Sequence, residues 1–419
     1  MSLYTLKYGR SYQSFLLPDD WETELLTYDE PAPLDPEAAL IESLKNPISE
    51  KPFDKWLEGF KKILIICPDI TRYAGMDYIL PILYEKYLKE KDVNIVFALG
   101  NHRKHTEEER KSIVSENIYK IFSCFDHDCF DKNALMFFGK TSSGLEVFLN
   151  KALSECDAVV VTGSINFHYL AGFGGGRKAI FPGIAGYETI LGIHGKVFNK
   201  DKPGKHSLAR SGILKGNPMH EEIMEGIKLI KTPMFLINTV IDDKKNLLKI
   251  FSGDLKKAHE EGCMWYRGHF GINITRKAEV VIVSAGGFPK DINFIQTHKA
   301  IEHALNGVKE KGFMVVLGRC EDGIGNEDFL RWFDYPSIEE MEKHVRCADK
   351  VYAQTAYATR IKARYCNIIL VSDLKADVVI KMGLIPKATV DEAITYISKI
   401  NKEKKFCYII PNGSNMLIL

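Results

Sequence analysis

The sequence predicts an α/β protein of two domains, each built on a mostly parallel sheet, with an active-site cleft between the domains. Apolar segments of strand length alternate with helical segments through both halves of the chain, and this alternation is typical of βαβ units. The chain has 419 residues, more than the roughly 250–300 residues that one hydrophobic core usually spans. A cleft between two such domains is a common position for a small-molecule site.

The N-terminal half supplies the first set of elements. Residues 4–17 alternate loosely between apolar and polar side chains, which suggests a hairpin, and residues 30–57 suggest a helix with loops. The predicted strands are Lys62–Cys67, Asn94–Leu99 and Ala158–Thr162. The predicted helices between them are Tyr78–Lys89 and Thr106–Ser115.

The C-terminal half repeats the alternation. Its predicted strands are Val280–Ser284, Phe313–Leu317, Asn367–Ser372, Val378–Lys381 and Cys407–Ile410. Its predicted helices are Ile292–Lys309, Ile338–Ala348 and Val390–Lys399. A polar, glycine-bearing segment over residues 240–275 separates the two sets. We therefore predict an N-terminal domain of residues 1–268, which carries most candidate site residues, and a C-terminal domain of residues 269–419.

The composition argues against nucleic-acid and membrane partners. The formal net charge is +1 and the pI is about 7.6, so no strong positive field is available for polyanions. No apolar run approaches the roughly 20 residues that span a bilayer, and the N-terminus lacks the apolar core of a secretory signal. Nine cysteines without a Cys-x-x-Cys pair predict reduced thiols in a cytoplasmic protein.

A polar pair follows the first predicted strand of the N-terminal domain. Asp69 and Arg72 come directly after the strand that ends at Cys67. At the carboxyl end of a strand, an aspartate can orient a histidine, and an arginine can bind a carboxylate through two hydrogen bonds. The alternative is a turn or helix cap formed by Asp69.

A histidine follows the second predicted strand. Thr106 and Glu109 match a capping box that starts the next helix, which leaves His102 in the preceding loop. Its pKa near neutrality suits a general base; a surface histidine is the alternative. Further along, Asp126-His127-Asp128 has the residue types of a metal site but only one histidine.

The third predicted strand leads into the run His168-Tyr-Leu-Ala-Gly172-Phe-Gly-Gly-Gly-Arg-Lys178. Its glycines permit close approach of a ligand, and exposed N–H groups can bind an anion. The run lacks both the Walker A pattern and the acidic residue of a dinucleotide site. It predicts either a phosphate-binding loop or a nucleophilic Lys178 that bonds to a cofactor or substrate carbonyl. His194 lies sixteen residues further on.

The predicted C-terminal domain contributes one more motif, Gly287-Phe-Pro-Lys-Asp-Ile-Asn-Phe-Ile-Gln-Thr-His-Lys299. If Asp291 caps a helix there, Gln296 and Lys299 are three residues apart and share one face. We expect both side chains to point towards the first domain; a solvated helix face is the alternative.

Taken together, in this order and nearly this spacing, the motifs resemble the nickel-pincer-dependent lactate racemase family. The resemblance runs from about Ile63 to Ala300, and more loosely to the C-terminus. It is most specific over His168–His194, where the family pattern His-x-x-Ala-Gly-Phe-x-Gly-Gly-Arg-Lys occurs. Other segments typical of the family are Pro182-Gly-Ile-Ala-Gly186, Gly216-Asn-Pro218 with His220, and Pro289-Lys-Asp-Ile-Asn293.

The resemblance implies a nickel ion held in a pyridinium-derived mononucleotide with two sulfur arms. By position, Lys178 would be joined to one arm through a thioamide and His194 would be the protein ligand to nickel, whose planar, soft-donor coordination suits Ni(II). His102 and His168 match the family's two acid/base histidines. The residues that would contact cofactor or substrate are Asp69, Arg72, Gly174, Gly175, Gly176, Arg177, Gln296 and Lys299.

The implied reaction is the racemisation or epimerisation of a 2-hydroxy acid. Removing an α-proton beside a carboxylate is difficult, whereas passing the hydroxyl proton to a histidine while hydride leaves carbon gives a planar 2-keto acid. His102 and His168, from two strand ends, would serve opposite faces, and Arg72 and Lys299 would hold the carboxylate. The implied partners are a small 2-hydroxy acid and the enzymes that mature the cofactor.

Three departures from the family concern the substrate. Ile295 stands where the lactate enzymes are expected to have tyrosine, and Gly174 stands where another small residue is usual. A late tryptophan expected in the lactate enzymes has no counterpart around residues 351–358, where Gln354 and Tyr357 lie. Lactate and longer, dicarboxylic or sugar acids therefore all stay open as substrates.

Two other functions also stay open. One is a zinc-type metal-dependent hydrolase or lyase with His102, His127, His168 and Asp69 as ligands, although no two histidines show the spacing His-x-x-x-His. The other is a non-catalytic protein that binds a phosphate or cofactor.

Overall fold

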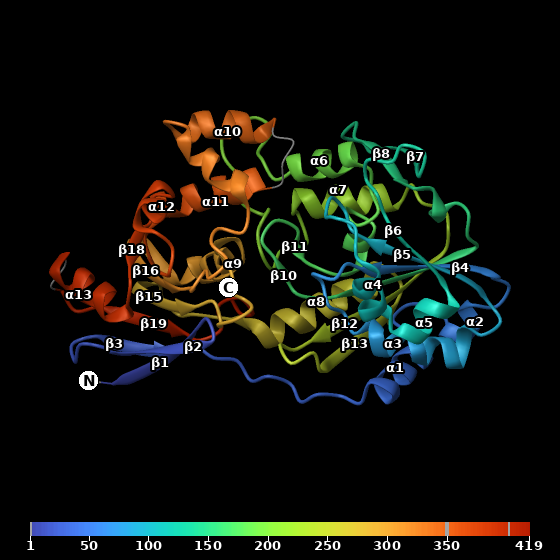
Figure 1. Cartoon of the computed structure of the whole chain (residues 1–419), viewed down its shortest axis with the longest axis horizontal. Helices are drawn as coiled ribbons and strands as arrows, with labels where there is room; N and C mark the ends of the chain where they lie inside the picture. Colours follow the sequence, from blue (N-terminus) through green and yellow to red (C-terminus); the bar gives the residue numbers. More distant parts are fainter. Residues whose placement is uncertain (1, 348–351, 401–402) are drawn as a thin grey trace. The chain divides into compact units, whose positions relative to one another are not determined.

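The computed structural model describes residues 2–347, 352–400 and 403–419, in two compact units (Figure 1). The large unit comprises Glu30–Asn199 and Lys205–His269, and the small unit comprises Met1–Asp29, Lys200–Gly204 and Phe270–Leu419. The predicted mixed α/β class with mostly parallel sheets in two domains is confirmed.

Two segments of the predicted N-terminal domain, residues 1–29 and residues 200–204, group with the small unit. Residues 1–29 do so because β3 (Glu22–Leu25) pairs in parallel with β19 (Phe406–Ile410) at the edge of the small unit's sheet. The predicted N-terminal hairpin is present as β1 (Leu3–Tyr8) and β2 (Ser11–Leu16).

The large unit is built on a six-stranded sheet of order β13-β12-β9-β4-β5-β6. All neighbours are parallel except β13, which runs antiparallel to β12. The strands are β4 (Lys62–Pro68), β5 (Asp92–Ala98), β6 (Ser123–Asp126), β9 (Ala158–Ser164), β12 (Met234–Ile241) and β13 (Leu247–Gly253). A separate hairpin is formed by β7 (Leu135–Lys140) and β8 (Glu146–Asn150).

The order of these strands creates a switch point between β4 and β9. The chain passes from β4 through β5 to β6 on one side, and then returns to place β9 on the other side of β4. In open α/β sheets, ligands bind at the carboxyl ends of the strands where the order reverses. The loops that follow β4 and β9 carry Asp69, Arg72 and the glycine run, so the topology brings the first and third motifs to one edge.

Apolar packing fixes this sheet in place. Ile63 and Ile65 of β4 face a cluster that includes Leu40 of α1 and Leu80 of α3, while Ile66 is buried on the opposite face. A strand covered on both faces is apolar throughout, which explains the predicted strands. The helices of this unit are α1 (Pro36–Lys45), α2 (Phe53–Trp56), α3 (Met76–Leu83), α4 (Glu107–Val114), α5 (Glu116–Ile121), α6 (Tyr187–Gly195), α7 (Pro218–Ile227) and α8 (Lys257–Phe270), with a π-helical turn at Tyr84–Leu88.

The glycine run folds as a small hairpin followed by one helical turn. β10 (Phe167–His168) pairs antiparallel with β11 (Gly172–Phe173), and the 3₁₀ turn η3 (Gly176–Ala179) carries Arg177 and Lys178. Gly172 has φ +82°, and a Cβ on it would lie 2.0 Å from the carbonyl oxygen of Ile213. Only glycine therefore fits at the return of this hairpin.

The small unit has a fully parallel sheet of order β18-β17-β16-β15-β19-β3. Its other strands are β15 (Ala278–Ser284), β16 (Val308–Leu317), β17 (Asn367–Val371) and β18 (Ile385–Lys387), and short β14 (Gly271–Ile272) pairs with β20 (Leu417–Ile418). Its helices are α9 (Phe294–Ala304), α10 (Ile338–Arg346), α11 (Tyr352–Tyr365), α12 (Ala376–Lys381) and α13 (Val390–Ile400).

One predicted strand of this unit is wrong, and two predicted helices differ in length. Residues 378–381 belong to helix α12, where Val379 is buried while Ile380 is 61% exposed; an apolar run this short does not distinguish a strand from a helix. The helix predicted from Ile292 to Lys309 ends at Ala304, and β16 begins at Val308. Ala348, the predicted end of α10, lies outside the described residues. Among the residues described, no helix is both long and apolar enough to cross a membrane.

Replacing Gly172 by alanine should destabilise the protein much more than the same change at Gly144, in the β7–β8 turn. The two residues have almost the same positive φ, +82° at Gly172 and +83° at Gly144. An alanine at either position would therefore suffer the same backbone strain, about 1–2 kcal/mol. Only the new Cβ at Gly172 meets backbone, since nothing lies within 4 Å of one at Gly144. Urea unfolding should show a loss of about 3 kcal/mol or more for G172A alone. Equal losses would contradict the close packing against Ile213.

Candidate active site

An aspartate–histidine pair lies beyond β4 and β5. Asp69 is 4% exposed, and its Oδ2 lies 2.5 Å from Nδ1 of His102. Its Oδ1 accepts from the backbone N–H and the hydroxyl of Thr71, at 2.8 and 2.6 Å. Because a carboxylate accepts, Nδ1 of His102 carries the proton and Nε2 carries the lone pair. The His102 side chain is 42% exposed, so a base with a fixed tautomer faces outward.

The Asp69 carboxylate stays ionised. Burial raises its pKa, but the hydrogen bonds from His102 and Thr71, together with the positive charge of Arg72, outweigh burial and hold the pKa below its usual value. An ionised carboxylate behind a histidine stabilises the imidazolium that forms when the ring takes up a proton. The pair is therefore suited to general base catalysis.

A second histidine–aspartate pair supports the loop that carries Asp69. Nε2 of His105 accepts from the backbone N–H of Ile70 at 3.1 Å, and its Nδ1 lies 2.9 Å from Oδ1 of Asp126. Both side chains are almost fully buried. This pair could not be predicted from short motifs, because its two residues are 21 positions apart in the chain.

The predicted Asp126-His127-Asp128 motif does not act as one group. Asp126 binds His105, whereas His127 is buried, with Nε2 2.9 Å from the carbonyl oxygen of Ala185. Asp128 forms an ion pair with Lys104 at 3.1 Å. Within the described ranges, no group of three His, Cys, Asp or Glu side chains could hold a metal ion.

His168 and Lys178 form a close pair at the carboxyl end of β9. Nδ1 of His168 accepts from the backbone N–H groups of Leu170 and Ala171, at 3.2 and 3.1 Å. The neutral ring therefore carries its proton on Nε2, which lies 3.0 Å from Nζ of Lys178. An N–H that points at the amine requires a lone pair on Nζ, so the geometry fits an uncharged lysine.

Electrostatics agree with this assignment. Burial, followed by the positive charges of Arg72 and Arg177, lowers the pKa of Lys178 well below its usual value. Burial and the charges of Lys178 and Arg72 likewise lower the pKa of His168. These effects also mean that the residues share one neighbourhood, so the structure brings together four predicted site residues, Arg72, His168, Lys178 and His194.

His194 lies near the end of α6 and is 8% exposed. Its Nδ1 lies 2.8 Å from the carbonyl oxygen of Ile190, one turn earlier, so Nδ1 donates and Nε2 holds the lone pair. Burial lowers its pKa to about 4, against the opposing effect of the Ile190 hydrogen bond. A neutral imidazole with its second nitrogen held by a carbonyl is the usual form of a metal-ligating histidine.

Arg177, predicted to bind the cofactor, instead points into the protein. It is 1% exposed; its Nε donates to Nδ1 of His220 at 2.9 Å, and its Nη2 donates to the carbonyl oxygen of Ala171 at 2.9 Å. Nε2 of His259 lies 2.9 Å from both Nη1 of Arg177 and the carbonyl oxygen of Gly174. Burial lowers the pKa of Arg177 to about 10. The side chain therefore ties the glycine run to α7 and α8.

The glycine run itself is packed against protein. The N–H of Gly174 donates to the carbonyl oxygen of Asn166 at 2.8 Å, and that of Gly176 donates to Oδ1 of Asn238 at 3.0 Å. These two N–H groups are thus not directed at an anion, contrary to the expected phosphate cradle. One donor is still available at this edge: Nδ2 of Asn238 is buried and, in the described structure, has no hydrogen-bond partner.

Gln296 and Lys299 both lie on α9 of the small unit. The helix is capped by Asn293, whose Oδ1 accepts from the N–H of Gln296 at 3.0 Å. Asp291, the predicted cap, is buried and accepts from the N–H groups of Gly9 and Arg319 at 2.6 and 3.1 Å. Gln296 is half-buried and Lys299 is exposed; their roles at the substrate stay predictions.

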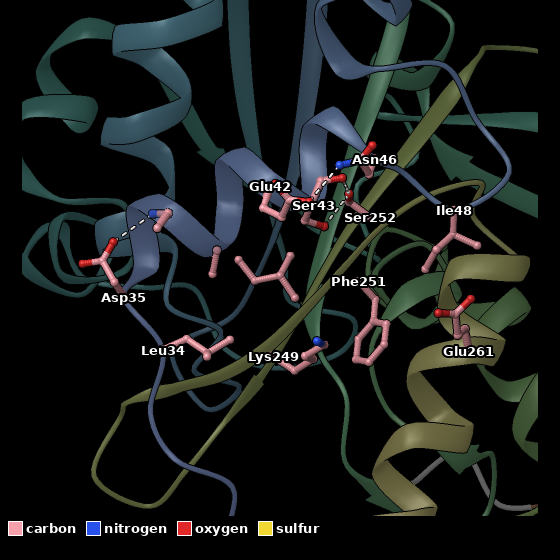
Figure 2. A pocket seen from close by; sticks show the side chains of 13 residues that line it. Leu34, Asp35, Glu42, Ser43, Asn46, Ile48, Lys249, Phe251, Ser252 and Glu261 are labelled. Atoms are coloured by element: carbon pink, nitrogen blue, oxygen red, sulfur yellow. Dashed lines mark hydrogen bonds between the residues drawn. The ribbon is translucent and has the colours of Figure 1, made fainter.

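A pocket of about 380 Å³ lies elsewhere in the large unit, where α1 meets β13 (Figure 2). Leu34, Ser43, Phe251, Ser252 and Glu261 are among its lining residues, and the hydroxyls of Ser43 and Ser252 are 2.7 Å apart. No candidate site residue lines it, so this pocket is separate from the chemistry described above.

Comparison with known families gives matches in both halves of the chain. Residues 8–205 match the model of the lactate racemase N-terminal domain, and residues 274–418 match that of the lactate racemase C-terminal domain. Lactate racemase from Thermoanaerobacterium thermosaccharolyticum is 30% identical, over 100% of this chain and 99% of the relative. Lactate racemase from Lactiplantibacillus plantarum is also 30% identical, over 90% of this chain and 89% of the relative.

Solved structures agree with these matches. The lactate racemase apoprotein from T. thermosaccharolyticum superposes with a TM-score of 0.91, at 30% identity and covering 100% of both chains. A protein from Thermotoga maritima, 19% identical, has a TM-score of 0.63 over 93% of this chain and 99% of its own, and therefore shares the fold alone.

The buried histidines around Arg177 should make the free energy of unfolding decrease as the pH is lowered. In the unfolded chain His220 protonates at its ordinary pKa of 6.5, whereas burial and the charge of Arg177 lower the folded value to about 3. Below pH 6.5 the unfolded state therefore binds more protons, and stability present above that pH is lost as the pH falls. The free energy of unfolding, measured in urea at pH 7 and pH 5, should fall less for H220N than for the native chain.

The matched control is His269→Asn. His269 is an exposed histidine on α8, the helix that also carries His259. This variant should keep the native pH dependence. If H220N also keeps it, protonation of His220 does not contribute to the loss of stability.

Proposed function

We propose that this chain, which belongs to the lactate racemase family and is therefore an isomerase, inverts a 2-hydroxy acid. The proposed reaction is hydride transfer to a nickel-pincer nucleotide carried on Lys178. The observation that carries the proposal is the placement of two histidines, His102 with its lone pair on Nε2 against Asp69 and His168 3.0 Å from Lys178. They follow β5 and β9, at and beside the switch point of the sheet.

The residues present fit such a cofactor. The uncharged amine of Lys178 is the nucleophilic form that an acyl or thioacyl bond requires. His194 has the lone pair of its neutral imidazole on Nε2, as a nickel ligand needs. The unpartnered Nδ2 of Asn238 is a donor beside Gly175 and Gly176 that a polar group of the nucleotide could accept from. When bound, the cofactor would accept hydride from the α-carbon of the substrate and return it.

His102 would take the hydroxyl proton of one enantiomer. Its Nε2 already holds the lone pair, and the Asp69 carboxylate behind it stabilises the positive ring that results. Arg72, which is exposed and close enough to affect both Asp69 and Lys178, would bind the substrate carboxylate. Gln296 and Lys299 would also contact the substrate, as the sequence predicts.

His168 would serve the other enantiomer, from the side of Lys178. Burial and the positive charges around it keep the ring unprotonated at neutral pH, which is the state a base needs. To accept a proton at Nε2 the ring must first carry its own proton on Nδ1, and the N–H groups of Leu170 and Ala171 oppose this. In a chain whose Lys178 carries the cofactor, the lysine nitrogen would no longer accept the Nε2 proton of His168, and the ring could change its tautomer.

The two other functions receive less support. A zinc-type hydrolase or lyase lacks a ligand cluster, since His127 is bound to Ala185 and the described residues contain no group of three metal-binding side chains. A non-catalytic phosphate carrier would leave the Asp69–His102 pair without a role. We further propose that the protein works in the cytoplasm with the enzymes that mature its cofactor, since its nine cysteines are all free thiols.

The substrate and the hydride step can be tested together. Protein co-produced with the maturation enzymes should convert single enantiomers of lactate, or of a longer, dicarboxylic or sugar 2-hydroxy acid, into racemic or epimeric product. With substrate carrying deuterium at the α-carbon in ordinary water, hydride transfer predicts that the product keeps the deuterium. Washout of the label into solvent would contradict hydride transfer and favour proton abstraction.

Substitution of the acid/base residues should lower the rate without removing the cofactor. H102A and H168A should each reduce kcat by about 10²–10⁴, the usual contribution of a general acid or base. D69N should reduce kcat comparably to H102A, because the amide no longer holds the proton on Nδ1. His269→Ala is the control and should leave kcat unchanged. Full activity of H102A or H168A would remove that histidine from the mechanism.

A further inference from the structure

The amine of Lys178 is set up for a reaction that needs no cofactor. We infer that, in chains whose Lys178 is unmodified, this lysine captures 2-keto acids as imines. The inference goes beyond the racemisation proposed above and does not depend on it, because it concerns the free amine.

The position of one proton on His168 identifies Nζ of Lys178 as a hydrogen-bond acceptor. Two backbone N–H groups, from Leu170 and Ala171, converge on Nδ1 of His168. A ring nitrogen that accepts two donors holds a lone pair, so the proton of the neutral ring lies on Nε2. That N–H points at Nζ of Lys178 across 3.0 Å. An ammonium group has no lone pair and could not accept the Nε2 proton of His168, whereas the uncharged amine can accept it.

The positive charges around the amine also disfavour its protonation. Arg72 and Arg177 both act on Lys178, and each disfavours a further positive charge. The carboxylate of Asp69, which is close enough to Arg72 to interact with its charge, already accepts hydrogen bonds from His102 and Thr71. A buried lysine beside other cations is a nucleophile at neutral pH. The residue is nevertheless partly exposed, so a small reagent can reach it.

The chemistry is balanced without an oxidant or reductant. The lone pair of Nζ attacks the carbonyl carbon, a C–N bond forms, and the carbonyl oxygen leaves as water after receiving two protons. Both protons come from the amine nitrogen, the first directly and the second through His168, whose ring exchanges one proton with the intermediate and is unchanged at the end. The product is a neutral imine between Lys178 and the keto acid.

A 2-keto acid is the class of carbonyl compound that this site favours. Its carboxylate matches the positive charge of Arg72, which lies near enough to affect Lys178 and His168. A guanidinium can bind a carboxylate through two hydrogen bonds, and it would then hold the adjacent carbonyl at the amine. A neutral aldehyde lacks this contact and should react less.

The test uses the full chain made in a host without the maturation enzymes, so that Lys178 is free. The protein is incubated at pH 7 with pyruvate and sodium cyanoborohydride, which fixes an imine as a stable amine, and is then digested and mapped by mass spectrometry. An ordinary lysine is uncharged in only about one part in 10³ at this pH. Labelling at Lys178 should therefore exceed that at the exposed Lys120 by at least about tenfold.

Two variants and one comparison make the result specific. K178R should lose the preferred adduct, and R72A should lose more labelling by pyruvate than by acetaldehyde. Equal labelling of Lys178 and Lys120, or a preference of the native chain for acetaldehyde, would overturn the inference. Cofactor loading is measured separately, on protein co-produced with the maturation enzymes. If the free lysine forms the pyruvate adduct but the co-produced protein carries no cofactor, only the proposed cofactor is rejected. If the co-produced protein carries the cofactor but the free lysine forms no adduct, only the imine is rejected.

Discussion

The buried guanidinium of Arg177 is the interaction on which the candidate site depends. It lies inside the protein and donates to two neutral acceptors, Nδ1 of His220 and the carbonyl oxygen of Ala171, with Nε2 of His259 also 2.9 Å away. Burying a charge costs several kcal/mol unless hydrogen bonds compensate, so these acceptors must stay neutral and in place. Since Arg177 and Lys178 are adjacent in one 3₁₀ turn, the same contacts decide where the lysine points.

The two histidine pairs differ in charge, and this difference gives them different chemistry. His102 has the ionised carboxylate of Asp69 behind it, at Nδ1. His168 has Lys178 and two arginines around it, which favour the unprotonated ring. The His102–Asp69 pair is thus suited to accept a proton from substrate. In the His168–Lys178 pair, the lysine stays uncharged and able to form a covalent bond. Both assignments rest on which atoms accept hydrogen bonds.

The sequence was sufficient for most of the fold and for the candidate residues near the switch point, because their signals are local. Apolar strands buried on both faces, such as Ile63–Cys67, and the glycine run after β9 can be recognised from short segments. Three contacts could not be recognised in this way, because each joins residues that are distant in the chain. They are the parallel pairing of β3 with β19, the His105–Asp126 pair, and the contacts of Arg177 with His220 and His259. The only prior signal for His220 was its place in a family-like segment after Gly216-Asn-Pro218.

The most direct test of the account is the intact mass of the protein co-produced with the cofactor-maturation enzymes, followed by peptide mapping across Gly172–His194 and determination of bound nickel. The account predicts a mass increment confined to Lys178, accompanied by nickel that is lost when His194 is replaced by alanine while the organic adduct stays. An unmodified Lys178, in a host shown to make the cofactor, would contradict the proposed attachment and with it the hydride mechanism.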